Sequence, residues 1–221
     1  MSPGGETAAH GSPPAGAPEP AGILLAAGGS SRFGAQKLLQ PLGGVPLVRI
    51  AAERVLAGGV ASLAVVLGRE ATSVRAALEG LPLRLVLNHR YAAGLAGSIR
   101  AGIRALPPDA GGALVALGDQ PGVRADVVGA LLLAFRRGAG PIVAPEYAGV
   151  RGHPVLFARD VFPDLLRLRG DEGARSLLAA HPERVHLVPF DFPSPPDVDT
   201  PADYEQLAAL DTGGPQAHSP R

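Results

Sequence analysis

Continuous apolar runs alternate with amphipathic stretches along the first two thirds of this chain. The apolar runs are short and nearly free of polar residues, which is typical of buried strands; they lie at 22–27, 62–67, 83–87 and 113–117. The amphipathic stretches repeat apolar residues at helical spacing, at 46–57, 70–79, 95–106 and 124–137. Pro46 suits a first helical position and the Gly58-Gly59 pair suits a helix end, which supports the first of these helices.

This strand–helix alternation predicts an α/β fold with a doubly wound, mostly parallel sheet. After residue 140 the elements become shorter. We expect a strand at 141–144, a β-ribbon beginning within 149–158, helices at 160–168 and 172–180, a strand near 184–189, and a last helix from Pro201. The later elements would form a small β-ribbon and helical elaboration on the substrate side of the sheet.

The chain has 221 residues, which is enough for one large domain with a substantial core. Residues 1–20 contain five Pro and four Gly and predict a disordered leader. The stretch 211–221 has a similar composition and predicts a disordered tail. The folded domain is therefore expected to span 21–210.

Composition and charge exclude several classes of function. The formal net charge is zero and 18% of residues are charged, which argues against nucleic acid or a membrane surface as partner. There is no cysteine, so disulfides, thiolate nucleophiles and cysteine-ligated metals are excluded. No apolar run approaches the roughly 18–20 residues of a membrane span. We expect a cytoplasmic protein.

A glycine-rich segment follows the first predicted strand, where a parallel sheet binds its ligands. Its small residues allow several backbone N–H groups to point at an anion, and Arg32 and Lys37 add two cations for phosphate oxygens. Lys37 is the only lysine beside 19 arginines, which indicates a need for a compact ammonium group. An ordinary glycine-rich turn is the alternative. The candidate nucleotide-binding residues here are Leu25, Ala26, Ala27, Gly28, Gly29, Arg32 and Lys37.

Two common nucleotide-binding loops do not fit this segment. A Walker A loop has Lys directly after its last Gly and then Ser or Thr, whereas Ala35-Gln36 precede Lys37 and Leu38 follows it. A dinucleotide fingerprint requires G-x-G-x-x-G, and the glycines at 28, 29 and 34 are out of that register.

The segment LAAGGSSRFGAQKLLQPLGGVPL at 25–47 closely resembles the signature of the MobA-like NTP transferases, and most of all their molybdenum cofactor cytidylyltransferase branch. The resemblance continues through nearly all of 22–208. It implies a Rossmann-like nucleotidyltransferase fold, a nucleoside triphosphate substrate and Mg²⁺. It also implies that Lys37, Arg32 and Asp119 are the catalytic residues.

Two aspartates are candidate ligands for Mg²⁺. Asp119 lies just beyond the predicted strand 113–117, where a hard carboxylate can link a metal to a triphosphate; a helix N-cap is the alternative. Asp199 lies in PDVDTPADY and matches the second acid of the family's Asp-Ile/Val-Asp-Thr-Pro motif, with Asp197 as the neighbouring alternative. Taken alone, Asp199-Thr200-Pro201 is an ordinary helix start.

Further resemblances suggest the nucleotide's surroundings. In NHRYAAGLAGSIRAG at 88–102, Gly94 and Ser98 match residues near the ribose and base, although Ser98 is also placed to cap a helix. Relatives of the cytidylyl branch have Ala at the position of Ala27, and guanylyl relatives have Gly. A methyl group there leaves less room for a purine, so CTP is expected rather than GTP, with other contacts contributing.

The acceptor side rests on the segments RGHPVLF and GDEGARSLL. They match the cytidylyltransferase branch and imply that Arg151, His153, Asp171 and Arg175 bind the phosphorylated pterin acceptor. A structural role for His153 and a solvated helix face for Arg175 are the alternatives.

The expected reaction is transfer of CMP from CTP to the terminal phosphate of molybdenum-loaded molybdopterin, with release of pyrophosphate. A molybdoenzyme or its chaperone would receive the product. Three alternatives stay open: a related nucleotidyltransferase that uses GTP or another phosphorylated acceptor, a flavin- or NAD(P)H-linked oxidoreductase of the MobA-like group, and a non-catalytic nucleotide sensor.

Overall fold

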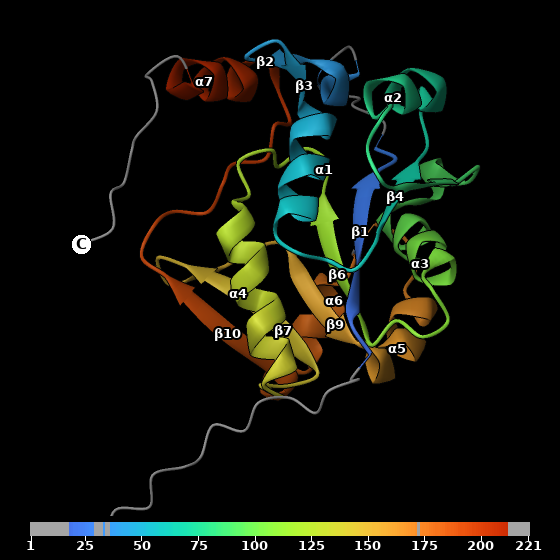
Figure 1. Cartoon of the computed structure of the whole chain (residues 1–221), viewed down its shortest axis with the longest axis vertical. Coiled ribbons are helices and arrows are strands. Elements are labelled where there is room, and N and C mark those ends of the chain that lie inside the picture. The colour runs from blue at the N-terminus through green and yellow to red at the C-terminus, as the bar shows by residue number, and fades with distance from the viewer. Residues whose placement is uncertain (1–17, 29–32, 34–35, 172, 212–221) are drawn as a thin grey trace, which may run out of the picture.

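The computed structural model describes residues 18–28, 33, 36–171 and 173–211. An eight-stranded sheet forms the centre of this part of the chain, in the order β10-β7-β9-β6-β1-β4-β5 with β8 paired to β7 (Figure 1). Its strands are β1 Pro20–Ala26, β4 Leu63–Leu67, β5 Arg84–Leu87, β6 Gly112–Leu117, β7 Ile142–Tyr147, β8 Val150–Arg151, β9 Val155–Ala158 and β10 Val185–Phe190. A separate two-stranded ribbon pairs β2 Pro41–Leu42 with β3 Val45–Pro46.

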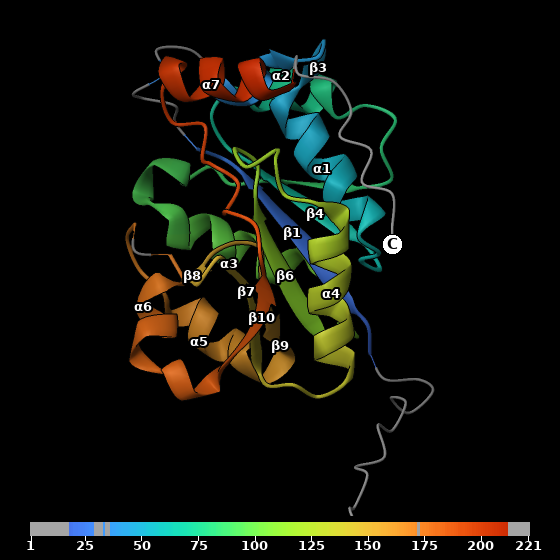
Figure 2. The same ribbon diagram turned by 90° about the vertical axis from the view of Figure 1, so that its left-hand side faces the viewer.

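Helices cover both faces of the sheet: α1 and α4 lie on one face, and α3, α5 and α6 on the other (Figure 2). The α-helices are α1 Leu47–Ala57, α2 Ala71–Ala77, α3 Leu95–Ala105, α4 Ala125–Arg136, α5 Phe162–Arg167, α6 Arg175–Ala180 and α7 Pro201–Asp211. Short 3₁₀ turns are η1 Lys37–Leu39, η2 Tyr91–Ala93, η3 Arg159–Val161 and η4 Pro182–Arg184. Within the described residues, no helix is both long and apolar enough to cross a lipid bilayer.

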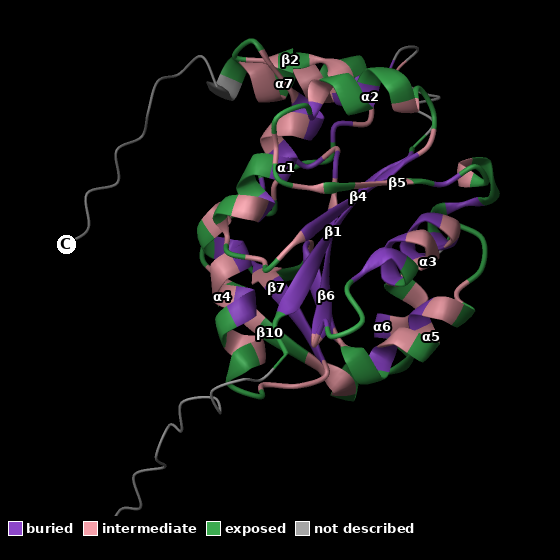
Figure 3. Cartoon of the chain, turned by 45° about the vertical axis from the view of Figure 1, so that its right-hand side comes forward, coloured by how far each residue is buried: buried purple, intermediate pink, exposed green. Residues whose placement is uncertain are grey.

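The core consists of two apolar layers, one on each face of the sheet. Successive side chains of a strand point to opposite faces, so Leu24 and Ala26 of β1 join the layer under α1 and α4. Leu25 and Ala27 join the layer under α3. The central strands are buried on both faces (Figure 3), which explains why their sequences are continuously apolar.

The strand order places one end of the sheet in position for ligand binding. β1 pairs in parallel with β4 on one side and with β6 on the other. After β5, the chain returns through α3 to β6, so the strand order reverses next to β1. A crevice at the carboxyl ends of the strands is expected at such a point. The loops after β1 and β6 both open there.

The predicted fold class is confirmed, and the structure refines its boundaries. α1 begins at Leu47 and not at Pro46, which ends β3. Pro20 already lies in β1 and Glu19 pairs with Arg136, so the folded domain starts before the predicted boundary at residue 21.

The largest difference from the predicted elements concerns β9. The expected ribbon within 149–158 would lie outside the main sheet, but β9 is inserted between β6 and β7 and is antiparallel to both. The physical reason is its sequence: Val155, Leu156 and Phe157 are consecutive and at most 3% exposed, so this strand needs cover on both faces.

Gly58 permits a close approach of α1 to α4. A Cβ at this position would lie 2.3 Å from Val128 Cβ and 3.1 Å from the carbonyl oxygen of Ala125. Gly58→Ala should therefore lower the free energy of unfolding by about 1–3 kcal/mol through overpacking. Urea denaturation followed by circular dichroism measures this. Gly129→Ala on α4 is the matched control. Its Cβ would lie at an ordinary contact distance of 3.6 Å from the carbonyl oxygen of Gly58, so the stability of this variant should be unchanged or raised. Equal stability of the two variants would contradict the close-approach argument.

Candidate active site

Three side chains from distant parts of the sequence meet at the carboxyl end of the sheet. Lys37 of η1 follows β1, Asp119 follows β6, and Asp199 precedes α7. The Lys37 Nζ atom lies 2.6 Å from Asp119 Oδ2 and 2.7 Å from Asp199 Oδ1. The structure thus brings together the two predicted metal ligands, which are separated by 80 positions, around the predicted catalytic lysine.

Buried neighbours hold Lys37 in place. Gln36 is 4% exposed, and its side-chain amide donates a hydrogen bond of 3.1 Å to the carbonyl oxygen of Arg69. Leu38 is buried in the core layer under α1. Because residues on both sides of Lys37 are anchored, the direction of its side chain is fixed by the fold.

The cap at the start of α7 is formed by residues next to Asp199. Thr200 and Asp203 form a reciprocal cap at the start of α7, in which the Asp203 carboxylate accepts from the backbone N–H and the hydroxyl of Thr200. The backbone N–H of Asp203 donates to the Thr200 hydroxyl at 3.3 Å. Thr200 is therefore the N-cap, and the Asp199 side chain is directed to Lys37.

The segment before α7 is tied to the loop after β6. The backbone N–H of Val198 donates to the carbonyl oxygen of Asp119 at 3.0 Å, and the Val198 side chain is completely buried. Next to it, the Gln120 amide donates to Asp197 Oδ1 at 2.6 Å. These contacts fix both carboxylates, Asp119 and Asp199, relative to one another.

A cavity of about 580 Å³ opens at this cluster and contains most of the predicted nucleotide-binding residues. Its lining includes Leu25, Ala27, Gly28, Lys37, Gly94, Ser98 and Asp119. Ala26 is not in the lining, because the alternation of β1 turns its side chain into the core layer on the other face. Gly29 and Arg32 lie outside the described residues.

The start of α3 forms one wall of this cavity. Gly94 has φ +105°, and a Cβ there would lie 2.4 Å from the carbonyl oxygen of Gly170, so a side chain is excluded on both counts. The Leu95 N–H donates to Asp171 Oδ1 at 3.3 Å. Ser98 is not an N-cap: it is buried within α3 and accepts a hydrogen bond of 3.1 Å from the Asn88 amide.

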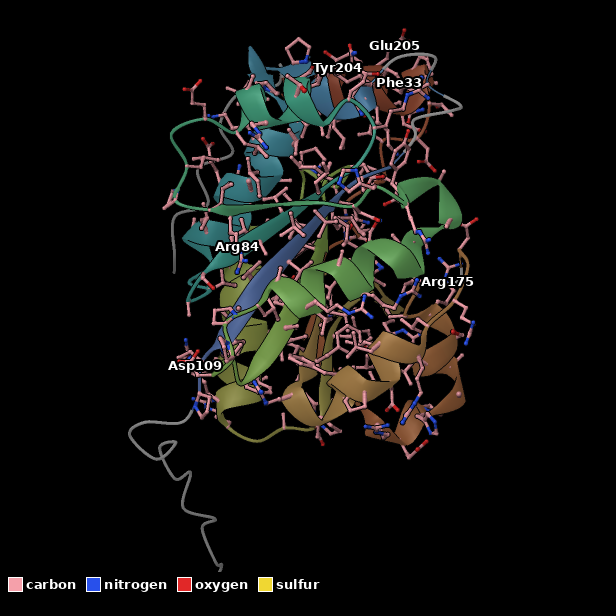
Figure 4. All side chains as sticks on the ribbon, turned by 90° about the vertical axis from the view of Figure 1, so that its right-hand side faces the viewer. Phe33, Arg84, Asp109, Arg175, Tyr204 and Glu205 are labelled. Carbon is pink, nitrogen blue, oxygen red and sulfur yellow. The ribbon has the colours of Figure 1, made fainter. Side chains whose placement is uncertain are left out.

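A second cavity of about 600 Å³ adjoins the first. Its lining includes all four residues predicted to bind the acceptor, which are Arg151, His153, Asp171 and Arg175. Its walls are otherwise largely apolar, with Ile99, Val155 and Phe157. Figure 4 shows Arg175 at the edge of the fold beside α3. Both cavities share the side chains of Leu25, Leu95, Leu117 and Asp171. Lys37 and Asp119 of the charged cluster line the first cavity, and these four residues form the boundary between it and the second.

The profile of the MobA-like NTP transferase domain matches residues 22–185 of this chain. The chain belongs to the MobA-like NTP transferase family. This confirms the family expected from the 25–47 segment. As a member of this family, the protein is an enzyme of the nucleotidyltransferase class, with a nucleoside triphosphate as substrate.

Three relatives span nearly the whole folded part. Nicotine blue oxidoreductase of Paenarthrobacter nicotinovorans is 38% identical over 189 residues, which cover 81% of this chain and 91% of the relative. A manganese complex of Rv0371c from Mycobacterium tuberculosis H37Rv has a TM-score of 0.75 and 32% identity, over 87% of this chain and 99% of that chain. A nucleotidyl transferase from a Methanothermobacter species has a TM-score of 0.76 and 26% identity, over 88% and 98% of the two chains.

The electrostatics of this MobA-like site keep Lys37 charged. Burial alone would lower the pKa of Lys37, whose side chain is 8% exposed. The charge of Asp119 and the hydrogen bonds to Asp119 and Asp199 outweigh burial and raise that pKa above its ordinary value. A fixed ammonium group is therefore present at neutral pH.

Asp119 and Asp199 are the candidate ligands for a divalent cation at this site. Carboxylate oxygens of Asp119 and Asp199 converge on one positively charged atom, and hard oxygen ligands of this kind suit Mg²⁺ or Mn²⁺. The described residues contain no group of three or more His, Cys, Asp or Glu that could hold a metal alone. A bound ion would therefore complete its coordination with phosphate oxygens and water.

Several residues of the site were not predicted as its members, among them Gln120, Asp203 and Tyr91. Gln120 positions Asp197, Asp203 completes the cap beside Asp199, and Tyr91 lines the nucleotide cavity. Only Asp203 has a local signal, since Thr200-x-x-Asp203 is a capping-box spacing. The roles of Gln120 and Tyr91 depend on contacts made by the folded chain.

Two polar side chains of the second cavity, His153 and Asp197, are strongly affected by burial. Burial lowers the pKa of His153, and its Nδ1 atom has no hydrogen-bond partner among the described residues. Burial, with the charge of Asp119, raises the pKa of Asp197. Both groups therefore favour their neutral forms more than they would in water.

The lowered pKa of His153 predicts a pH-dependent stability. The unfolded chain takes up a proton on this residue below about pH 6.5 while the folded protein resists it, so stability should fall as the pH drops from 7 to 5. His153→Gln should flatten this dependence by at most about 1.4 kcal/mol per pH unit. Urea denaturation across this pH range measures it, with His186→Gln at an exposed position as control. An unchanged pH slope in His153→Gln would contradict the assignment.

Proposed function

We propose that this MobA-like enzyme transfers CMP from CTP to the terminal phosphate of molybdenum-loaded molybdopterin and releases pyrophosphate. The observation that supports the proposal is the Lys37–Asp119–Asp199 cluster beside a cavity that shares part of its wall with a second, arginine-containing cavity. A transfer between two bound phosphates requires that both be held close together in reacting geometry, which two adjoining cavities allow. Arg151 and Arg175 provide cations on the acceptor side.

The reaction is an in-line displacement. An oxygen of the acceptor phosphate forms a bond to the α-phosphorus of CTP, and the bond from that phosphorus to the bridging oxygen breaks. The electron pair leaves with pyrophosphate. A phosphate monoester is already anionic at neutral pH, so the reaction needs no strong general base. Positioning and charge stabilisation by the protein are sufficient.

Lys37 supplies the fixed positive charge for this displacement. Its ammonium group lines the nucleotide cavity and would stabilise the α-phosphate and the departing pyrophosphate. Arg32 is proposed as a second cation on sequence grounds. A divalent ion, for which we propose Mg²⁺, would be held by Asp119 and Asp199 and would neutralise charge on the triphosphate.

The choice of CTP rests on Ala27. Its side chain is 4% exposed, and it lines the nucleotide cavity between Leu25 and Gly28. A methyl group at a buried position takes up space that a purine would use, at a cost of about 1–3 kcal/mol in discrimination. Further contacts from the α3 wall, at Gly94 and Ser98, would add to this preference.

The acceptor cavity is suited to a flat, ring-containing phosphate ester. Its apolar walls can cover both faces of a ring system, while Arg151 and Arg175 can bind the phosphate. The Asp197 carboxyl lines the same cavity and can accept hydrogen bonds from ring N–H groups. These features support a pterin, and the product would pass to a molybdoenzyme or its chaperone.

An oxidoreductase is the second candidate, because one relative is named nicotine blue oxidoreductase. The two functions consume different substrates and release different products. Redox activity would consume NAD(P)H or a reduced flavin without releasing pyrophosphate. NAD(P)H oxidation that does not depend on Lys37 would favour this alternative over nucleotidyl transfer.

Replacing Lys37 should reduce turnover strongly. Lys37→Ala removes the ammonium from the developing negative charge, and we expect a loss of about a hundredfold or more in kcat. Lys37→Arg should also lose most activity, since a planar guanidinium does not replace a compact ammonium between two carboxylates. Pyrophosphate release measures both variants, and far-UV circular dichroism controls for folding. Near-normal transfer by folded Lys37→Ala would exclude the proposed mechanism.

A substrate panel tests donor and acceptor together. Pyrophosphate release should be fastest with CTP and molybdenum-loaded molybdopterin, slower with GTP, and absent without the acceptor. Asp119→Asn should abolish the part of the rate that depends on Mg²⁺. A sugar phosphate that supports faster release than the pterin would overturn the acceptor assignment and leave the transferase assignment intact.

A further inference from the structure

A groove with four arginines lies between α3 and the end of α5, outside the two cavities described above. We call it the arginine groove; its lining residues are Arg100, Arg104, Leu166, Arg167, Leu168, Arg169 and Gly170. Its volume is about 690 Å³, comparable to each of the active-site cavities. Four of its seven lining residues carry positive charge, and none carries negative charge.

The arginines of the groove are mostly without compensating carboxylates. Arg167 pairs with Asp164 at 3.2 Å, and that carboxylate also pairs with Arg184. Within the part of the chain that the structure describes, Arg100, Arg104 and Arg169 form no ion pair. Among the described residues, the groove therefore concentrates three arginines without an ion pair, in a chain whose net charge is zero.

A hydrogen bond across the groove links its two walls. Arg100 is partly buried and donates a hydrogen bond to the carbonyl oxygen of Leu168 across the groove. Arg104 lies one helical turn further along α3, on the same side as Arg100. Arg167 and Arg169 come from the opposite wall. Guanidinium groups that face a common space from two sides can bind several oxygens of one anion.

The arginine groove is connected to the active site through residues 170 and 171. Gly170 lines the groove, and its carbonyl oxygen accepts from the backbone N–H of Ala96 at 3.1 Å. Asp171, the next residue, accepts from the N–H of Leu95 and lines both active-site cavities. The groove and the wall of the two cavities therefore share one continuous stretch of backbone.

We propose that the arginine groove binds a small phosphate-bearing anion, either free pyrophosphate or the triphosphate of a nucleotide, at a site separate from the active site. The fork geometry of arginine matches phosphate oxygens in pairs. Four arginines in one groove suit a small anion that carries several negative charges. A nucleic acid would require a longer basic track.

The test is calorimetric titration with inorganic pyrophosphate in the absence of divalent metal. Arg104→Gln/Arg169→Gln removes two exposed cations that have no ion pair within the described residues. Arg75→Gln/Arg137→Gln is the matched control, since it removes two exposed arginines at positions outside the groove. We expect the wild type and the control to bind one more equivalent of pyrophosphate than Arg104→Gln/Arg169→Gln does. If this variant still binds that equivalent, we expect its affinity to be at least tenfold lower.

Two further titrations separate the sources of the phosphate and the competing partner. If CTP shows the same dependence on Arg104 and Arg169 but pyrophosphate does not, the nucleotide is the ligand. Equal binding of both anions by all three proteins overturns the proposal. Binding of a polyglutamate peptide that depends on these arginines, without such dependence for either phosphate ligand, also overturns it and identifies an acidic protein segment as partner.

The titrations involve no turnover, so this proposal and the proposed transfer of CMP can fail independently. Circular dichroism of both double variants confirms that they are folded. Both pairs of positions are exposed, so the loss of one binding equivalent in Arg104→Gln/Arg169→Gln alone reports on the groove and not on stability.

Discussion

The ammonium group of Lys37 lies between carboxylates from two distant parts of the chain. Asp119 and Asp199 would repel one another without it, and the cation between them makes their approach favourable. The backbone hydrogen bond from Val198 to Asp119 holds the same two segments together. The positions of Lys37, the loop after β6 and the segment before α7 therefore depend on one charge arrangement.

The surrounding packing supports this arrangement without using the reactive groups themselves. Gln36 and Leu38 anchor the chain on both sides of Lys37, and the buried Val198 anchors the segment that carries Asp199. Thr200 and Asp203 cap α7, while an oxygen of the Asp199 carboxylate contacts Lys37. The residues that anchor these segments are thus distinct from Lys37, Asp119 and Asp199, and often next to them in the sequence.

Local patterns in the sequence predicted the strands, the main helices and most of the nucleotide cavity. The apolar run of β1 identified the loop after it, and a lone lysine identified the charged centre. The position of a residue along a strand also determines the face of the sheet to which its side chain points. Simple alternation therefore places Ala26 on the face away from the cavity, although it was predicted to bind the nucleotide. What the sequence shows well is chemistry within one element and its adjacent loop.

Contacts between distant elements were not visible in the sequence. Spacing alone does not bring Asp119 to Asp199, and the pairing of Gln120 with Asp197 depends on how residues 195–199 cross the β6 loop. The insertion of β9 between β6 and β7 likewise reflects competition among strands for a buried place. In each case the deciding partner lies many residues away.

The location of Asp199 has a consequence for the order in which the site is completed. Asp199 follows β10, so it is synthesised after every strand of the sheet. A chain that ended before residue 199 would contain the residues of every strand and the Lys37–Asp119 pair, but it would lack the second carboxylate of the charge cluster. The cluster is therefore complete only when the chain extends beyond the last strand of the sheet.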